Sequence, residues 1–265
     1  MPISTKNVAS EFVGTAELWG FHVNPGTMHD YINLLESQIN RGEKANLFAH
    51  NLHTLYEYFR SEKLEKAYRD SFVLIDGMPL IPLLKLAGFN AQRSHRVTYA
   101  DFIWPLLEHA AARGWRVFYV GQPEEVQEAA FANIKKRFPD IIISGHHGFF
   151  DSSAGSDDSK MVIDQINSFH TDLCIVGMGT PLQEYWVEEH RELIDAPALI
   201  VSGACLEYVS GVVGTPPRWM GRWGLEWSYR FFENPKRFAS RYFIEPWVLA
   251  YLMLSRNLFK RATSE

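Results

Sequence analysis

The chain has 265 residues, of which 46% are apolar and 22% are charged, so it can bury a full core and is not disordered. Its formal net charge of −5 gives no reason to expect nucleic acid as the main partner. The two cysteines, Cys174 and Cys205, lie in apolar runs, which argues against a disulfide scaffold or a zinc cluster and favours a reducing compartment.

Strand-like and helix-like segments alternate along the first 214 residues. Short runs rich in β-branched and aromatic residues predict strands at 45–50, 71–76, 115–121, 140–145, 172–179 and 198–203. Periodic segments predict helices at 51–68, 78–88, 99–113, 123–137, 158–169 and 181–193. Apolar strands that are each followed by a helix indicate a mostly parallel, Rossmann-like sheet covered by helices on both faces. The predicted fold class is α/β, with a core domain at 1–214.

The last fifty residues differ from the core. Residues 215–265 predict a helical appendage, in which Asn234 and Pro235 start one of the later helices. Residues 216–265 carry a net charge of +5, against −10 for the rest, and four of the eight tryptophans. This composition suits a lid or a membrane-surface module. The alternative is a tail that docks on its own domain, and both stay open.

The location of the protein follows from two other segments. The N-terminal ten residues lack the apolar stretch of a signal peptide, and the apolar run at 247–254 is too short to span a bilayer. We therefore expect a cytoplasmic protein.

The stretch FVLIDGMPL (72–80) places a carboxylate directly after a predicted strand. Asp76 and Gly77 form a strong turn signal, because Asp caps its own turn and Gly accepts positive φ. In parallel sheets, however, ligands bind outside the carboxyl ends of the strands. Asp76 is therefore a candidate catalytic base as well as a turn residue.

A second stretch, GMGTPLQEYW (177–186), joins a predicted strand to a helix and contains Gly-x-Gly-x-Pro. Backbone N–H groups at such a helix start can bind phosphate. The third glycine of a dinucleotide fingerprint and the Gly-Lys-Ser/Thr of a P-loop are both missing, so an NAD-dependent oxidoreductase is a weak alternative. Gln183 or Glu184 can instead contact a nucleotide, although Glu184 also suits the helix dipole.

The sequence shows no metal-binding motif, so charge on a phosphate group would need protein cations. Arg230, Arg237 and Arg241 can supply them, because a guanidinium matches phosphate oxygens.

Several motifs, taken in order, resemble those of the bacterial WecG/TagA/CpsF glycosyltransferases. They are RVTYAD (96–101), FYVGQP (118–123), GHHGFF (145–150), GMGTPLQE (177–184) and GLEWSYRFFENPKRFASRY (224–242), together with the Asp-Gly at 76–77. The resemblance implies an inverting, metal-independent enzyme without a cofactor. Such enzymes move a sugar from a UDP-sugar to a polyprenyl-diphosphate-linked sugar in the synthesis of exopolysaccharide, teichoic acid linkage units or common antigen.

The resemblance also implies roles for single residues. Asp76 matches the general base. The residues that it places at the donor or nucleotide are Arg96, Thr98, Asp101, Gly121, Gly177, Gly179, Gln183 and Glu184. Those that it places at the acceptor or at a diphosphate are Asn51, Arg230 and Arg237, to which we add Arg241.

The chain departs from the family pattern at Ala49, Tyr99, Gln122, Glu207, Thr215 and Ser240. These positions cluster around the expected sugar and acceptor pocket, so we expect a sugar specificity unlike that of the best-known members. The expected partners are a UDP-sugar, a polyprenyl-diphosphate-linked sugar and the inner face of the cytoplasmic membrane, where the protein would be peripheral. A homo-oligomer is one state that the sequence allows. A nucleotide-sugar-binding assembly subunit without catalysis remains the non-enzyme alternative.

Overall fold

A six-stranded parallel sheet lies at the centre of the molecule in the computed structural model, which describes residues 13–214, 220 and 225–255. Its strands run in the order β4-β3-β8-β7-β5-β6, and every neighbouring pair is parallel. The strands are β3 (Ala45–His50), β4 (Phe72–Ile75), β5 (Arg116–Gly121), β6 (Ile142–His146), β7 (Leu173–Gly177) and β8 (Ala198–Val201). The predicted strands and the α/β fold class are confirmed.

The sheet separates two hydrophobic cores, because successive side chains of a strand point to opposite faces. In β4, Val73 and Ile75 join one core, whereas Phe72 and Leu74 join the other. The same alternation occurs in β3, β5 and β7. A strand that is buried on both faces needs apolar residues at nearly every position, which is why these strands appear as continuous apolar runs.

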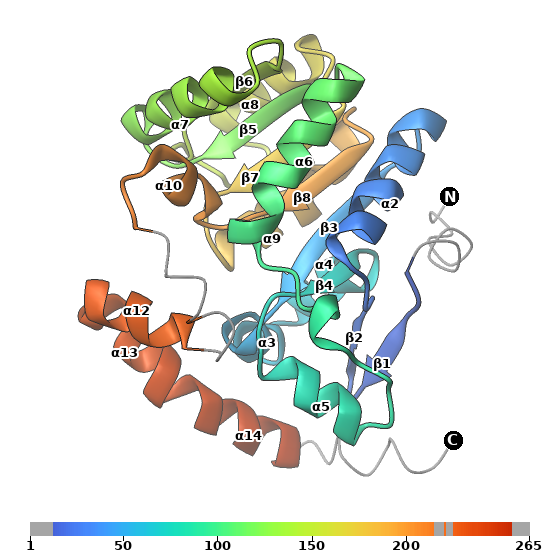
Figure 1. Ribbon diagram of the computed structural model, residues 1–265, viewed down its shortest axis with the longest axis vertical. Coiled ribbons are helices and arrows are strands. Elements are labelled where there is room, and N and C mark those ends of the chain that lie inside the picture. The colour runs from blue at the N-terminus through green and yellow to red at the C-terminus, as the bar shows by residue number, and fades with distance from the viewer. Residues whose placement is uncertain (1–12, 215–219, 221–224, 256–265) are drawn as a thin grey trace.

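Helices cover both faces of this sheet (Figure 1). One face is covered by α2 (Met28–Arg41), α6 (Tyr99–Arg113), α7 (Glu124–Arg137) and α10 (Cys205–Ser210). The other is covered by α3 (Leu52–Tyr58), α4 (Glu62–Arg69), α5 (Leu80–Leu86), α8 (Asp157–Ser168) and α9 (Leu182–His190). Two 3₁₀ turns complete this part of the chain, η1 (Arg93–His95) and η2 (Arg191–Leu193).

The N-terminal part contains elements that the sequence analysis did not predict. β1 (Ala16–Leu18) and β2 (Phe21–Val23) form an antiparallel hairpin, and both residues of its turn have positive φ. The hairpin leads into α2, where Thr27 and Asp30 form a capping box. The helix predicted at 51–68 is in fact two helices, because Ser61 caps the start of α4 by accepting a hydrogen bond from the Leu64 N–H.

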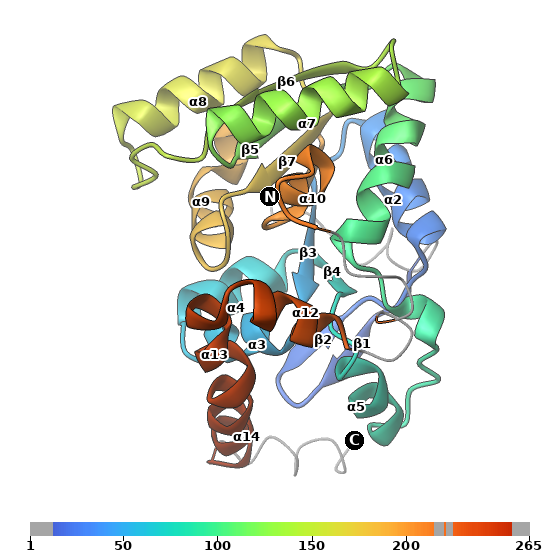
Figure 2. The ribbon, with the colours of Figure 1, turned by 60° about the vertical axis from the view of Figure 1, so that its left-hand side comes forward.

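Within the described residues near the C-terminus lie the helices α12 (Glu226–Glu233), α13 (Pro235–Phe243) and α14 (Glu245–Ser255). They lie beyond the carboxyl ends of β3 and β4, and α12 lies closest to the sheet (Figures 1 and 2). As predicted, Pro235 is the first helical residue of α13, and the Asn234 carbonyl accepts the first helical hydrogen bond from Phe238 at 3.2 Å.

The appendage contacts the core through α14 and α3. Leu249 and Met253 of α14 are buried and belong to one of the two hydrophobic cores. At the start of α14, Glu245 Oε2 lies 2.6 Å from His53 Nδ1 on α3. The appendage and the core therefore share buried surface, and a division of the chain at about residue 214 stays a prediction.

Candidate active site

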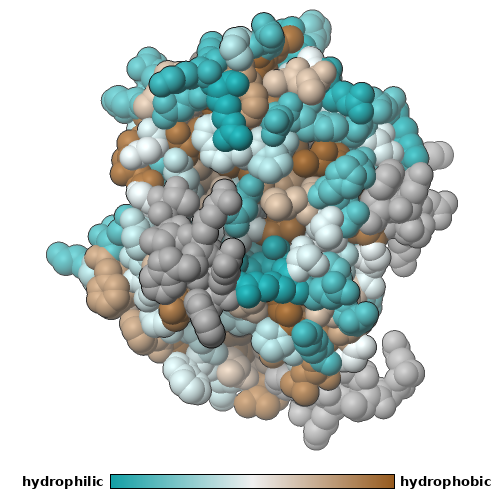
Figure 3. Space-filling view, in the orientation of Figure 1, coloured by the Kyte–Doolittle hydropathy of each residue, from teal (hydrophilic) through white to brown (hydrophobic). Residues whose placement is uncertain are grey.

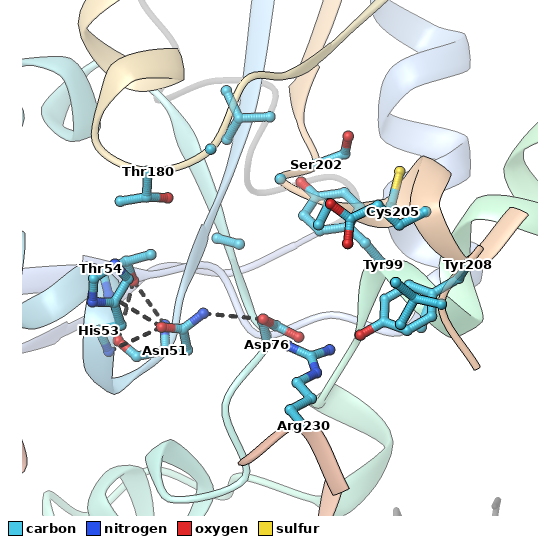
Figure 4. A pocket seen from close by; sticks show the side chains of 18 of the residues that line it. Asn51, His53, Thr54, Asp76, Tyr99, Thr180, Ser202, Cys205, Tyr208 and Arg230 are labelled. Carbon is cyan, nitrogen blue, oxygen red and sulfur yellow. Dashed lines mark hydrogen bonds between the residues drawn. The ribbon is translucent and has the colours of Figure 1, made fainter. Parts of the chain in front are cut away.

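A cavity of about 450 Å³ opens where the carboxyl ends of β3, β4 and β8 meet the loop after β7. Its lining includes polar side chains from all four of these connections and from the appendage (Figure 4). Among them are Asn51, Asp76, Thr180, Glu184, Ser202, Tyr208, Arg230 and Arg241. The edge of the sheet that the sequence indicated as the binding edge is therefore the edge that carries the cavity.

Asp76 is held in this cavity by the turn that follows β4. Its backbone N–H donates to the His50 carbonyl at 3.0 Å, and its own carbonyl accepts from Arg96 Nε at 3.1 Å. Its side-chain Oδ2 accepts a hydrogen bond from Asn51 Nδ2 at 3.1 Å (Figure 4). The backbone thus fixes where the carboxylate stands, and Asn51 fixes how it is turned.

Asn51 is itself fixed, because it is the N-cap of α3. Its Oδ1 accepts the backbone N–H groups of His53 and Thr54, at 3.0 and 3.1 Å. Since the amide oxygen faces these donors, the amide nitrogen must face Asp76, and the orientation of the side chain is unambiguous. The same residue caps a helix and presents a donor to the candidate base.

Gly77 serves this turn for a different reason from the one predicted. Its φ is not positive, so the conformational freedom of glycine is not what the site uses. A Cβ at Gly77 would lie 3.0 Å from the Asn51 Cα and 3.1 Å from its Cβ. The absence of a side chain allows the two loops to approach closely, which brings Asn51 within hydrogen-bond distance of Asp76.

Gln183 connects two of the loops that form the cavity. Its Oε1 accepts the backbone N–H groups of Gly179 at 3.2 Å and Gly203 at 3.1 Å. Its Nε2 donates to Glu184 Oε1 at 3.0 Å and to Thr180 Oγ1 at 3.4 Å. All four hydrogen-bonding positions of the amide are therefore in use. The N–H of Gly179 is occupied as well, so the loop does not offer it to a phosphate as a dinucleotide-binding loop would.

Glu184 is the most deeply buried acid of the cavity, with 1% of its surface exposed. Its Oε1 accepts hydrogen bonds from Thr180 Oγ1 at 2.8 Å and from Gln183, whereas its Oε2 has no hydrogen-bond partner among the described residues. Burial raises the pKa of the carboxyl, and these hydrogen bonds oppose the shift only in part. Because Oε1 already accepts two donors, the proton of the neutral acid belongs on Oε2.

This arrangement predicts a stability that falls with rising pH. The folded protein holds the Glu184 proton at pH values where the unfolded chain has lost it. The stabilisation is complete below the unfolded pKa and is lost as the pH rises through the raised folded pKa. Glu184→Gln has a side chain of the same shape that stays neutral at every pH. We expect the melting temperature of this variant to increase relative to that of wild type as the pH rises. The slope cannot exceed about 1.4 kcal/mol per pH unit for a single proton.

The measurement is thermal unfolding of both proteins between pH 4 and pH 9. Glu62→Gln is the matched control, because Glu62 is exposed on α4, and its curve should stay parallel to that of wild type. Parallel curves for Glu184→Gln and wild type would contradict a raised pKa for the Glu184 carboxyl.

The cations of the cavity come from the appendage. Arg230 of α12 and Arg241 of α13 line it. The Arg230 guanidinium carbon lies 5.6 Å from the centre of the Tyr208 ring, within the range of a cation–π contact. Arg237 lies on α13, but its side chain is outside the described part of the structure. Of the acids that line the cavity, Asp76, Glu184 and Glu207 come from the core, and Glu233 comes from α12 of the appendage.

A second cavity, of about 490 Å³, adjoins the first and shares Asn51, His53, Asp76, Arg230 and Arg241 with it. It lies between the loop after β4 and the appendage. Its remaining lining is largely apolar and includes Leu52, Met78, Pro79, Pro82, Trp227, Tyr242, Phe243 and Pro246. Asp76 therefore stands where a polar cavity and an apolar cavity meet.

A profile of the glycosyl transferase WecG/TagA/CpsF family matches residues 16–263, which is nearly the whole chain. The chain belongs to this family. Similar proteins include one from Bacillus spizizenii that is 30% identical over 185 residues, covering 70% of this chain and 69% of that protein. A Bacillus subtilis protein is 29% identical, covering 71% and 70%, and one from Staphylococcus aureus is 28% identical, covering 66% of each. All three are named N-acetylglucosaminyldiphosphoundecaprenol N-acetyl-beta-D-mannosaminyltransferase.

Membership of the WecG/TagA/CpsF family makes this chain a glycosyltransferase, and the resemblance stated from its motifs is confirmed. Of the residues that the resemblance assigns to the donor, Gly179, Gln183 and Glu184 line the polar cavity. Arg96 lines the apolar cavity and supports the Asp76 backbone.

Four other residues assigned to the donor of a WecG/TagA/CpsF enzyme lie outside the lining of both cavities. Thr98 Oγ1 donates to Asp101 Oδ2 at 3.2 Å at the start of α6. A Cβ at Gly121 would lie 2.5 Å from the Gly177 carbonyl, so these glycines allow β5 and β7 to approach closely. Their assignment to the donor site stays a prediction.

Some lining residues were not indicated by the sequence, notably His53, Ser202 and Tyr208. Ser202 lies near the carboxyl end of the predicted strand at 198–203, the edge at which ligand-binding side chains are expected. His53 and Tyr208 lie within helices, and the sequence carries no signal that these helices face the cavity.

Proposed function

We propose that this glycosyltransferase moves a sugar from a UDP-sugar to a polyprenyl-diphosphate-linked sugar, with inversion and without a metal ion. The observation that carries the proposal is the position of Asp76 between a polar and an apolar cavity. A direct transfer requires the donor and the acceptor to meet at one base. Asp76 would accept the proton of the acceptor hydroxyl as its oxygen attacks the anomeric carbon, whose bond to the diphosphate oxygen breaks.

The polar cavity suits the donor. Negative charge develops on the leaving diphosphate, and Arg230 and Arg241 line the cavity from the appendage side, where they can stabilise that charge. Within the described residues, no three His, Cys, Asp or Glu side chains cluster in a way that could hold a metal ion. The guanidinium groups support the metal-independent form of the reaction, because they supply the positive charge that it needs.

The apolar cavity suits the first part of a lipid acceptor, and the appendage surface suits the membrane. Trp247, Tyr251 and Leu254 of α14, with Ile244 just before it, follow a spacing of three and four residues and are all exposed, Trp247 by 77%. Hydrophobic side chains are visible over the appendage helices at the lower left and lower edge of Figure 3. No helix in the described part of the chain is long and apolar enough to cross a bilayer. We place the protein peripherally on the inner face of the cytoplasmic membrane.

The names of the relatives support the acceptor class. They act, by name, on N-acetylglucosaminyldiphosphoundecaprenol, a sugar joined through a diphosphate to a polyprenyl chain. We propose the same class of acceptor here, and we leave the donor and acceptor sugars to the assay because the identity is about 30%.

The test is a donor screen with a synthetic polyprenyl-diphosphate-linked sugar. We expect one UDP-sugar to give a product whose mass has grown by one sugar residue and whose new bond has the inverted configuration, with equal turnover in EDTA. UDP should raise the melting temperature, whereas NAD(H) should not. Lipid-stimulated release of UDP would exclude the non-catalytic assembly subunit, and NAD(H) stabilisation without any transfer would contradict the proposal.

A further inference from the structure

Tyr208 occupies a position in the site that neither the motifs nor the family match assigns to a role. It lies on α10, directly after β8, and lines the polar cavity as a half-buried residue. Its phenol oxygen points toward Asp76 and Arg230 (Figure 4). Among the described residues, none forms a hydrogen bond with this hydroxyl. By contrast, the nearby polar side chains of Asn51, Gln183 and Thr180 each form hydrogen bonds with other residues of the site.

The ring and the hydroxyl of Tyr208 have separable tasks. The ring lies beneath Arg230, whose guanidinium carbon is 5.6 Å from the ring centre, so the ring supports the cation that the appendage brings to the cavity. The hydroxyl takes no part in this contact, which involves the ring and the guanidinium. A substitution that keeps the ring and removes the hydroxyl therefore tests the hydroxyl alone.

The chemistry of the hydroxyl is that of a donor. Burial raises the pKa of Tyr208, and the charge of Arg230 opposes this shift, while Asp76, Glu207 and Glu233 reinforce it. The phenol stays protonated at neutral pH as a result. An O–H group beside a guanidinium is suited to an oxyanion that the guanidinium attracts, because each can donate to a different oxygen.

The position of the Tyr208 hydroxyl between Asp76 and Arg230 indicates which group of the ligand it contacts. In the proposed reaction, on which this inference rests, the anomeric carbon lies within reach of the oxygen that Asp76 deprotonates. The phosphate bonded to that carbon then lies toward the arginines. We propose that the Tyr208 hydroxyl donates a hydrogen bond to the sugar-bearing phosphate of a diphosphate ligand. The proton stays on the tyrosine throughout, so no further proton transfer is needed.

Two ligands carry such a phosphate, the UDP-sugar and the polyprenyl-diphosphate-linked sugar, and binding measurements can separate them. Titration calorimetry would compare wild type with Tyr208→Phe, using UDP, UMP and farnesyl diphosphate as probes. We expect the affinity for UDP to fall at least about tenfold, as for loss of a hydrogen bond to a charged group, with little change for UMP, which lacks the second phosphate. A loss confined to farnesyl diphosphate would assign the same contact to the acceptor.

Two further variants complete the test. Tyr185→Phe is the matched control, because the Tyr185 hydroxyl donates to Ser61 at 2.9 Å and lies outside both cavities. Tyr208→Leu also removes the support of Arg230 and should bind UDP more weakly than Tyr208→Phe. Affinities of Tyr208→Phe within twofold of wild type for both diphosphates, or an equal loss for UMP, would overturn the inference. Wild-type protein that binds neither diphosphate would instead contradict the proposed function.

Discussion

Replacing Asp76 by asparagine should lower the turnover number by about 10²–10⁴, the usual effect of removing a proton-transfer group. The amide cannot accept the proton of the acceptor hydroxyl, although its carbonyl oxygen can still accept the hydrogen bond that Asn51 Nδ2 donates to Asp76 Oδ2 in the wild type. Binding of UDP should survive, because Arg230 and Arg241 remain in the cavity. Single-turnover transfer with saturating donor, together with UDP titration, measures the two effects separately.

The control for this variant is Asp70→Asn. Asp70 is an exposed carboxylate at the C-terminus of α4, before β4 begins, and so lies at the opposite end of that strand from Asp76. The turnover number of Asp70→Asn should equal that of wild type. If Asp76→Asn turned over within threefold of wild type while remaining folded, Asp76 would not be the base.

Replacing Arg230 by glutamine should lower turnover by about 10²–10³, comparable to the loss of one charge-stabilising donor from an oxyanion site. The reason is its position, because Arg230 lines both cavities and stands beside Asp76 (Figure 4). Arg230→Lys should recover only part of the loss, since an ammonium cannot match two phosphate oxygens at once. The measurement is the turnover number and the Michaelis constant for the donor in each variant.

Arg113→Gln provides the comparison for the loss of a positive charge. Arg113 is at the end of α6, where its Nε lies 2.7 Å from Glu36 Oε1 at the surface. We expect no change in turnover, as a surface ion pair of this kind contributes little. Equal turnover in Arg230→Gln and Arg113→Gln would show that Arg230 does not contribute to catalysis. Other groups would then have to stabilise the negative charge of the leaving diphosphate.

The sheet could be predicted from the sequence because parallel strands buried on both faces are apolar throughout, as in ALIV at 198–201. The hairpin at 16–23 could not, because strands of three residues are too short to show a period. The signals for α2 and for the start of α4 were present, as Thr27 with Asp30 and as Ser61. These are capping residues, which local sequence does encode.

The candidate site likewise has some features that could be predicted from the sequence and others that could not. Asp76 comes directly after the apolar strand FVLI, so its location at the sheet edge could be predicted. The bond from Asn51 to Asp76 spans 25 residues, and the bond from the Gly203 N–H to Gln183 spans 20. Both depend on how close two loops come, and sequence patterns do not record that distance. The approach of α12 to Tyr208 is likewise a result of tertiary docking.

The seven-residue helix α3 links the appendage to the chemistry. Asn51 caps its first turn and holds Asp76, while His53 in that same turn meets Glu245 at the start of α14. A displacement of α14 that tilted so short a helix would also shift the amide that orients the carboxylate. Adsorption of the exposed face of α14 onto a lipid surface would thereby act on Asn51, two residues from His53, and through its hydrogen bond on the Asp76 carboxylate, without any long-range relay through the sheet.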